Sequence, residues 1–148
     1  MAATLVDTNV LVYVHDPRDR RKQAVAADLL DTLFAAEQVV ISVQCMTEFF
    51  AAVRRLPDAM SRAEALDQID RIARASRIVD LTAAVTFEAL RGAERHRLSV
   101  WDALIWSAAK LNQIPFVLTE DAQHGRVLEG VRYLNPFDSA FDPRVLSA

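Results

Sequence analysis

Four acidic residues in this sequence could together bind a divalent metal ion. They are Asp7, Glu48, Asp102 and Asp121. Carboxylate oxygens are hard ligands, which select Mg²⁺ or Mn²⁺ over zinc. Carboxylates at close range also raise one another's pKa unless a cation lies between them. If the fold brings these four side chains together, the sequence therefore predicts a Mg²⁺ or Mn²⁺ site.

Asp7 and Asp121 both come after short apolar runs that are typical of buried strands. Asp7 follows Thr4-Leu5-Val6 directly, and Asp121 lies three residues after Phe116-Val117-Leu118. Because ligands bind at the carboxyl ends of strands in open α/β sheets, we expect these two carboxylates at one edge of a sheet. Adjacent residues point in different directions, so only one of Glu120 and Asp121 is expected to enter the site. A helix cap or turn role is the alternative for each acid taken alone.

Glu48 lies in a predicted helix over residues 43–55 and has no basic neighbour one turn away. Its neighbours three and four positions away are Gln44, Cys45, Ala51 and Ala52. We expect a partly buried carboxylate, which needs a cation or hydrogen bonds to offset its desolvation. An ordinary solvated glutamate is the alternative.

Asp102 has both a local and a functional interpretation. Ser99 and Asp102 have the spacing of a capping box, which would give the carboxylate a purely local role. The helix that follows, over residues 100–112, is apolar on almost all sides, as buried helices are. Asp102 is therefore expected to point into the interior or into a pocket, and the two roles are compatible.

Short apolar runs alternate with segments of helical periodicity along the whole chain. The predicted strands cover residues 3–6, 39–41, 77–81, 116–118 and 131–134. The predicted helices cover residues 10–14, 20–36, 43–55, a segment capped by Ser61, 83–97 and 100–112. This alternation predicts an α/β fold with a parallel sheet of about five strands and helices on both faces. We expect one domain over residues 1–148, with a loose tail from about residue 138.

Composition narrows the class of protein. The 148 residues are 52% apolar and 25% charged, as in ordinary globular domains, and the formal net charge of −3 argues against a basic nucleic-acid-coating surface. The single Cys45 excludes an internal disulfide and a cysteine-based zinc site. Neither a secretory signal nor a membrane span is visible, so we expect a cytoplasmic protein with no membrane partner.

The motifs around the four acids, taken in order, resemble those of the PIN-domain ribonucleases, and most closely the VapC-like toxins of type II toxin–antitoxin systems. The four similar segments are Val6-Asp7-Thr8-Asn9-Val10-Leu11, Thr47-Glu48-Phe49, Leu98-Ser99-Val100-Trp101-Asp102-Ala103-Leu104-Ile105 and Leu118-Thr119-Glu120-Asp121-Ala122-Gln123-His124-Gly125. The resemblance spans nearly the whole chain.

This resemblance implies a PIN-like three-layer fold and a toxin that cleaves RNA endonucleolytically with Mg²⁺ or Mn²⁺. It implies that Asp7, Glu48, Asp102 and Asp121 are both the catalytic and the metal-binding residues. It also implies that Thr8, Asn9 and Thr119 support the acids, that the protein is a homodimer, and that a cognate antitoxin covers the pocket. Neither the RNA that is cut nor the class of antitoxin follows from the sequence.

Several basic residues are candidates for holding the RNA backbone, since arginine can bind phosphate with two parallel hydrogen bonds. They are Arg18, Arg20, Arg21, Lys22, Arg54 and Arg55. A solvated basic face is the alternative interpretation.

Two other classes of function compete with the nuclease. A phosphotransfer enzyme would use Asp7 as its nucleophile, but haloacid-dehalogenase-like phosphatases usually carry a second aspartate where this chain has Asn9. A catalytically silent PIN-like domain that only binds partners would be expected to lack one of the four acids, and none is missing.

Overall fold

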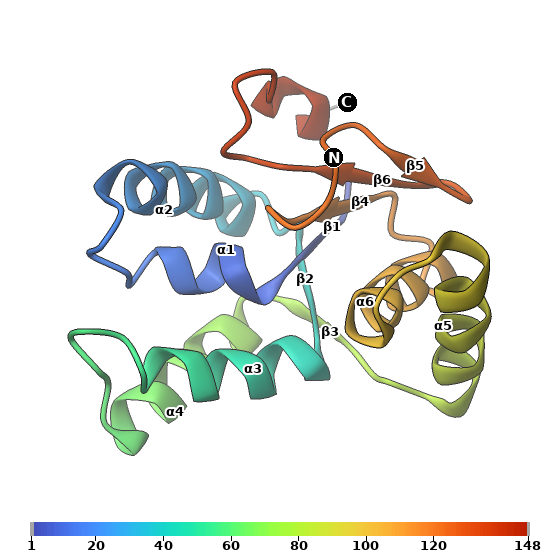
Figure 1. The fold of residues 1–148 in the computed structure, drawn as a ribbon. Helices are drawn as coiled ribbons and strands as arrows, with labels where there is room; N and C mark the ends of the chain where they lie inside the picture. The colour runs from blue at the N-terminus through green and yellow to red at the C-terminus, as the bar shows by residue number, and fades with distance from the viewer. Residues whose placement is uncertain (1, 148) are drawn as a thin grey trace.

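A six-stranded sheet lies at the centre of the computed structural model, which describes residues 2–147 (Figure 1). Its strands follow the order β3-β2-β1-β4-β6-β5, with β1 at Thr4–Val6, β2 at Val39–Ser42, β3 at Arg77–Val79, β4 at Phe116–Leu118, β5 at Val127–Leu128 and β6 at Val131–Leu134. All neighbouring strands pair in parallel except β5, which is antiparallel to β6. The predicted parallel α/β sheet is confirmed, with one further strand at its edge.

The additional strand β5 has only two residues, which is too short to show any periodicity in the sequence. Glu129 and Gly130 connect it to β6 with φ angles of 49° and 88°. Positive φ at both central residues is typical of tight two-residue hairpins. The hairpin holds the loop after β4 against β6, and that loop borders the site described below.

Six helices surround the sheet: α1 at Thr8–Tyr13, α2 at Arg20–Ala35, α3 at Val43–Val53, α4 at Arg62–Arg74, α5 at Ala83–His96 and α6 at Val100–Leu111. Ser42, Ser61 and Thr82 cap α3, α4 and α5, each accepting a hydrogen bond from a main-chain N–H three residues on, and the cap at Ser61 confirms the prediction. Asp7 is the N-cap of α1, where its side chain accepts a hydrogen bond from the Thr8 N–H.

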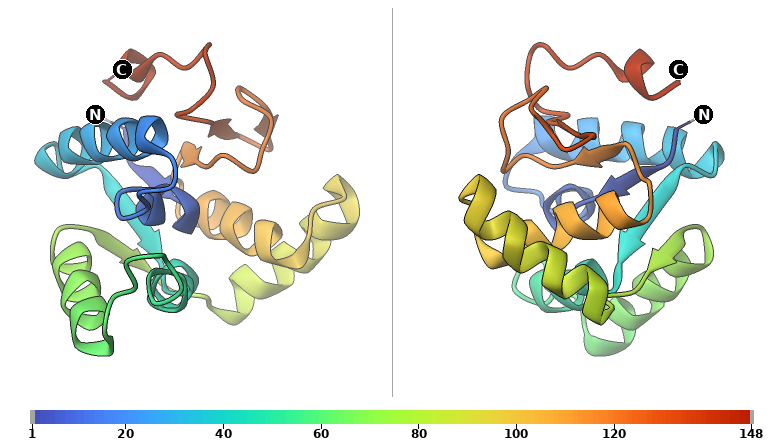
Figure 2. Two further views of the ribbon diagram at one scale, coloured as in Figure 1. Left: turned by 60° about the vertical axis from the view of Figure 1, so that its left-hand side comes forward. Right: turned by 90° about the vertical axis from the view of Figure 1, so that its right-hand side faces the viewer.

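The two faces of the sheet are covered by different helices, as predicted, and alternate residues of each strand enter different cores. Val6 and Leu118 join the core beneath α1–α4, whereas Leu5 and Val117 join the core beneath α5 and α6. Figure 2 shows the helices α1–α4 on one side of the sheet and the α5–α6 pair on the other. The loops at the carboxyl ends of β1 and β4 lie where these two helical groups diverge.

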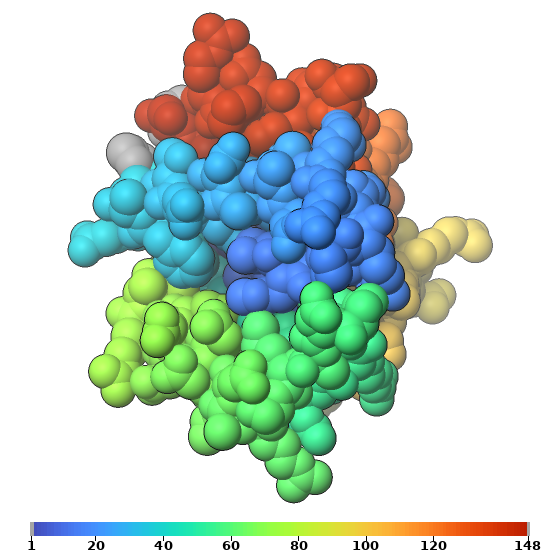
Figure 3. Space-filling model, turned by 90° about the vertical axis from the view of Figure 1, so that its left-hand side faces the viewer, coloured from blue at the N-terminus to red at the C-terminus, as the bar shows by residue number. Residues whose placement is uncertain are grey.

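The segment after residue 138 differs from the predicted loose tail. Residues Pro143–Ser147 form a short 3₁₀ helix, and Leu146 is only 2% exposed within the core beneath α1–α4. The Gln38 side chain donates a hydrogen bond to the Leu146 carbonyl at 2.7 Å. Figure 3 shows this segment, in red, packed along α2. Tertiary contacts with residues more than a hundred positions away order it, and these are invisible in the local pattern.

None of the helices within residues 2–147 has the length and apolar character needed to cross a membrane.

Candidate active site

Asp7 lies at the junction of β1 and α1, where the fold buries its carboxylate. The side chain is 7% exposed. Its Oδ1 accepts a hydrogen bond from the Thr8 N–H at 2.7 Å, and its Oδ2 accepts one from the Thr119 hydroxyl at 2.8 Å. Burial raises the pKa of Asp7 to about 6; these two hydrogen bonds oppose the rise, and the charges of Asp121 and Glu48 add to it. The carboxylate thus has neutral donors but still ionises less readily than an ordinary aspartate.

Asn9 joins Asp7 to the loop after β4. Its side-chain amide donates to Asp121 Oδ2 at 3.0 Å and to Thr119 Oγ1 at 3.2 Å, and lies 3.5 Å from Asp7 Oδ2. The Asp121 N–H in turn donates to Thr119 Oγ1 at 3.1 Å. The two acids that follow β1 and β4 therefore lie in one hydrogen-bonded group, because β1 and β4 are neighbours in the sheet.

Thr8 contacts Asp7 only through its main chain. Its hydroxyl oxygen is buried and has no hydrogen-bond partner within the described part of the chain. Thr8, Asn9 and Thr119 all lie beside Asp7, but only Asn9 and Thr119 reach it or Asp121 with their side chains.

Glu120 and Asp121 diverge, as expected of adjacent residues. The Glu120 carboxylate accepts hydrogen bonds from Lys22 Nζ at 2.8 Å and from the Tyr13 hydroxyl at 2.7 Å. Glu120 is thus neutralised by a neighbouring cation, whereas Asp121 turns toward Asn9.

Glu48 is exposed on α3, so the prediction of a partly buried carboxylate is wrong. The buried face of α3 consists of Gln44, Cys45, Phe49 and Val53, and Glu48 lies at its margin. The Gln44 amide donates to Glu48 Oε1 at 2.6 Å. Glu48 nevertheless borders a hollow that Asp7, Asn9 and Asp121 also line, and its charge contributes to the raised pKa of Asp7.

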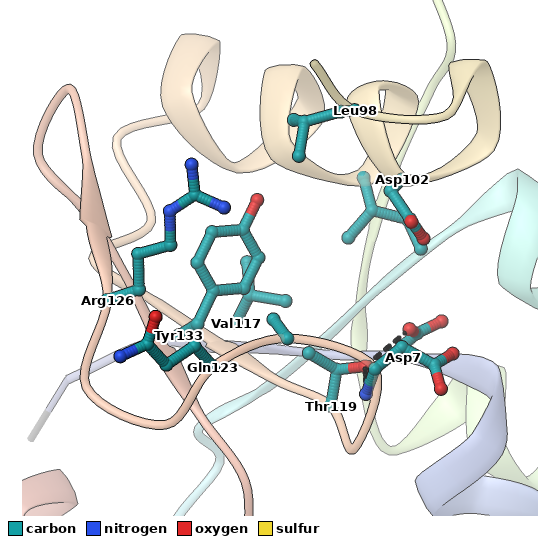
Figure 4. Close-up of a pocket in the computed structure, with 11 residues that line it drawn as sticks. Asp7, Leu98, Asp102, Val117, Thr119, Gln123, Arg126 and Tyr133 are labelled. Carbon is teal, nitrogen blue, oxygen red and sulfur yellow. Dashed lines mark hydrogen bonds between the residues drawn. The ribbon is translucent and has the colours of Figure 1, made fainter. Parts of the chain in front are cut away.

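Asp102 lies in the first turn of α6 and is half-buried. The Ser99 hydroxyl caps the helix by accepting from the Asp102 N–H at 3.1 Å, which uses the main chain of Asp102 and not its carboxylate. Figure 4 shows that carboxylate directed from α6 toward Asp7 and Thr119. Asp102, Asp7 and Asp121 line a second hollow, which encloses about 510 Å³ of space with its open mouth included.

The four acids therefore surround two adjoining hollows that share Asp7 and Asp121, with Asp102 on one side and Glu48 on the other. Within residues 2–147, no three carboxyl, imidazole or thiol groups are close enough to hold a metal ion as they stand. The donor set still fits a hard divalent cation, since it consists of carboxylate oxygens around a buried, unneutralised Asp7.

Most of the candidate RNA-binding residues have other partners in this structure. Arg18 forms two hydrogen bonds with Asp16, at 2.9 and 2.8 Å, and Lys22 pairs with Glu120. Arg21 donates to the Phe137 carbonyl at 3.0 Å, and the Arg54 guanidinium lies 5.4 Å from the centre of the Phe50 ring. No side-chain partner is found for Arg20 or Arg55 among the ion pairs of residues 2–147.

Sequence reasoning missed two polar residues that line the hollow beside Asp102. They are Arg126, in the loop before β5, and Tyr133, on β6. Tyr133 is 6% exposed, and burial, with the nearby charge of Asp102, raises the pKa of its hydroxyl. The position of Arg126 just after a glycine, in the loop that carries the last acid, is the one signal of its proximity to the site.

The model of the PIN domain family matches residues 4–129 of the chain. No curated protein matches this chain significantly.

Several solved structures share the fold. A toxin–antitoxin complex from Klebsiella pneumoniae matches with a TM-score of 0.68 and 17% identity, covering 92% of this chain and 99% of that one. The FitAcB structure from Neisseria gonorrhoeae matches with a TM-score of 0.67 and 21% identity, covering 90% and 98%. VapC20 from Mycobacterium tuberculosis, described as a toxin that cleaves the sarcin–ricin loop, matches with a TM-score of 0.61 and 21% identity, covering 78% and 87%. At these identities the likeness establishes a shared fold.

Proposed function

The chain belongs to the PIN domain family, and on that premise we propose that it is a metal-dependent endoribonuclease that acts as the toxin of a toxin–antitoxin pair. The observation that carries the proposal is the buried carboxylate of Asp7, which lies at the carboxyl edge of the sheet beside Asp121 and forms no ion pair with any described residue. An uncompensated buried carboxylate is unfavourable for folding, so a site that retains one is a candidate for binding a cation from solution.

Asp7, Glu48, Asp102 and Asp121 are the proposed ligands of one or two Mg²⁺ or Mn²⁺ ions. A bound divalent ion supplies a water of lowered pKa and polarises the phosphate that this water attacks. Asp7 must be deprotonated to serve as a ligand, and its hydrogen bonds from Thr8 and Thr119 favour that form. Hydrolysis by in-line attack of water would leave a 5′-phosphate and a 3′-hydroxyl, with no covalent intermediate on the protein.

Asn9 and Thr119 are proposed to position the acids. The Asn9 amide donates to Asp121, and the Thr119 hydroxyl donates to Asp7 while accepting from Asn9 and from the main chain of Asp121. These bonds hold two carboxylates of like charge beside each other. Thr8 contributes its main-chain N–H.

The proposed partners are RNA, a cognate antitoxin and a second copy of the chain, and the proposed place of action is the cytoplasm. Support for an antitoxin comes from structural neighbours that are themselves toxin–antitoxin complexes, among them the one from Klebsiella pneumoniae and VapBC2 from Rickettsia felis. An RNA substrate is supported by the described activity of VapC20.

The test is cleavage of a labelled mixed RNA pool by purified protein that has been freed of any copurifying partner. Cleavage is expected with Mg²⁺ or Mn²⁺, none with EDTA, and a loss of roughly a hundredfold or more in Asp7→Asn, as for other charge-stabilising groups in active sites. Asp28→Asn is the matched control, because Asp28 is an exposed acid on α2, away from the four acids. Cleavage that persists in EDTA, or in Asp7→Asn at the rate of Asp28→Asn, would contradict the proposal.

One observation favours a second candidate, a catalytically silent PIN-like domain that only binds partners. It is the separation of the acids, which leaves no three-ligand group within residues 2–147. A silent domain predicts no change in melting temperature on adding Mn²⁺, whereas a nuclease with this site predicts a rise that Asp7→Asn removes.

A further inference from the structure

The hollow beside Asp102 extends well beyond the acids, into a part of the molecule that the proposed metal site does not use. Its walls are formed by apolar side chains of Leu98, Ile105, Val117 and Ala122. Its far end holds three polar side chains, those of Gln123, Arg126 and Tyr133 (Figure 4).

The far end is built on a firmly held backbone. The Tyr133 N–H donates to the Arg126 carbonyl at 2.8 Å, and the Gly125 N–H donates to the Tyr133 carbonyl at 2.8 Å. The Arg126 N–H closes a turn on the Gln123 carbonyl at 3.1 Å, and His124 Nδ1 accepts from the Asn135 N–H at 3.0 Å. The loop is thus fixed to β6 before any ligand binds, which reduces the entropy lost on binding.

Two polar side chains on this backbone, those of Arg126 and Tyr133, have no ion-pair or hydrogen-bond partner within residues 2–147. The Tyr133 side chain is 94% buried, yet its hydroxyl has no hydrogen-bond partner within the described residues. None of the ion pairs found in residues 2–147 involves Arg126. Arg126 is exposed, and in Figure 4 its guanidinium lies near the hydroxyl of Tyr133. Buried polar groups are nearly always satisfied in native proteins, so an unsatisfied hydroxyl in a pocket indicates a missing partner.

The chemistry of the walls favours an uncharged, flat ligand over a phosphate group. Asp7, Asp102 and Asp121 line the near end of the same hollow and would repel a phosphate that no metal ion holds. A nucleobase has apolar faces for the aliphatic walls and a polar edge for the far end. Unpaired bases are bound in this way in single-stranded RNA, with hydrogen bonds to their edges.

From these contacts we propose that the hollow is a nucleobase subsite, in which Arg126, Tyr133 and Gln123 bind the edge of an unpaired base next to the cleaved bond. The proposal deepens the proposed function and rests on it for the RNA substrate. The two acceptors of guanine, O6 and N7, match the paired N–H groups of a guanidinium, so guanosine is expected to bind most tightly. Arg126, Tyr133 and Gln123 would then be specificity-determining residues.

The test measures base binding directly and does not depend on cleavage. ¹⁵N-labelled protein in EDTA is titrated with guanosine, adenosine, cytidine, uridine or inorganic phosphate, and the amide signals of residues 123–126 and 133 are followed by NMR. Saturable shifts with nucleosides, strongest for guanosine, are expected in these residues, together with at least a fivefold weaker affinity in Arg126→Gln and in Tyr133→Phe. Neither variant is expected to lower the melting temperature, because among the described residues Arg126 has no ion pair to lose and the Tyr133 hydroxyl has no hydrogen bond to lose.

Arg132→Gln is the matched control, because Arg132 precedes Tyr133 on β6 and therefore lies on the opposite face of the strand. It is expected to bind nucleosides as the unchanged protein does. Shifts that do not saturate, shifts with phosphate alone, or equal affinity in Arg126→Gln and Arg132→Gln would overturn the subsite.

The two proposals fail in different ways. If the protein binds guanosine through Arg126 but cleaves no RNA, the result supports the base subsite and contradicts the proposed nuclease activity. If the protein cleaves RNA in a metal-dependent manner but binds no nucleoside in this hollow, the result supports the nuclease and contradicts the base subsite. Where cleavage occurs, the distribution of bases at the cut sites is expected to change in Arg126→Gln and not in Arg132→Gln.

Discussion

Two regions of this molecule gather carboxylates, and they balance the negative charge in opposite ways. At the carboxyl edge of the sheet, burial raises the pKa of Asp7 to about 6, and no lysine or arginine within residues 2–147 pairs with it. On the far side of α6, a hydrogen bond from His96 and the charges of Lys110 and Arg95 lower the pKa of Glu129 to about 2.

In the second region, basic residues of the chain itself pair with the acids. Lys110 bridges Glu88 at 3.0 Å and Glu129 at 3.2 Å, and Arg91 pairs with Glu88 at 2.6 Å. These pairs join α5, α6 and the β5–β6 turn. Under the proposed function, acids neutralised by the chain's own cations stabilise the fold, whereas the acids at the edge of the sheet bind a cation from solution. The same amide substitution should therefore have opposite consequences in the two regions.

The largest difference is expected in catalysis. Asp102→Asn should lower the rate of RNA cleavage by roughly a hundredfold or more, because it removes a proposed metal ligand while its helix remains capped through Ser99. Glu129→Gln should cleave at the rate of the unchanged protein. Initial rates on one RNA with Mn²⁺, measured well below the melting temperatures of both variants, provide the comparison. Equal losses in the two variants would show that the two groups of acids do not differ in function.

The sequence predicted the parts of the site that depend on local pattern. Asp7 after a buried strand and Asp102 in an apolar helix could be found because a strand end and a helical periodicity are visible within a few residues. The closeness of Asp7 and Asp121 followed from the parallel topology, since β1 and β4 pair side by side.

The features that the sequence did not predict depend on contacts between distant residues. The exposure of Glu48 follows from the way in which α3 packs, and the order of the C-terminal segment follows from Leu146 meeting the core. The unpaired Arg126 and Tyr133 could not be recognised, because only the folded hairpin brings them together. The metal-binding role of the four acids remains a prediction.

The next largest effect is a pH dependence of stability at Asp7. In EDTA, the folded protein keeps a proton on Asp7 up to about pH 6, whereas the unfolded chain loses it near 3.8. The wild-type protein should therefore lose stability relative to Asp7→Asn as pH rises from about 4 to 6, by about 3 kcal/mol at most, and the difference should stay constant above that.

Denaturant unfolding of the two proteins at intervals from pH 4 to 8 measures this difference. Saturating Mn²⁺ should reverse it at neutral pH, since the ion stabilises only the carboxylate form. If the difference in unfolding free energy between the two proteins does not vary with pH, Asp7 has an ordinary pKa and its carboxylate is not destabilised by folding.

A smaller effect is expected from packing beneath the ion pairs of α5 and α6. Gly92 on α5 lies directly against the indole of Trp106, so a methyl group at this position would overlap the ring. Overpacking should destabilise Gly92→Ala by about 1–3 kcal/mol, and the higher helix propensity of alanine should offset part of this loss. RNA cleavage should be unchanged at low temperature. Thermal melting measures the loss, and the additional change Trp106→Leu should make the alanine nearly neutral. If Gly92→Ala instead abolished cleavage in a folded protein, the α5–α6 region would share in the activity.

The smallest effect is expected from Glu129 itself, and its pH dependence should be opposite in sign to that of Asp7. Because the pKa of Glu129 is lowered by folding, its carboxylate contributes stability that is present above about pH 4.5 and is lost as pH falls toward 2. Glu129→Gln should therefore lower stability by about 1 kcal/mol near pH 7, the upper end for partly exposed pairs, and by nothing near pH 2. Added salt should shrink the loss at neutral pH. Glu94→Gln, at an exposed position of α5 outside these ion pairs, is the control.

The two acids are expected to change stability in opposite directions within one fold. Raising the pH from 4 to 6 destabilises the metal-free protein through Asp7, whereas raising it from 2 to 4.5 stabilises the protein through Glu129. A protein in which Glu129→Gln and Glu94→Gln melt alike at every pH would show that the cations around Glu129 do not stabilise the fold, and the contrast between the two regions would rest on Asp7 alone.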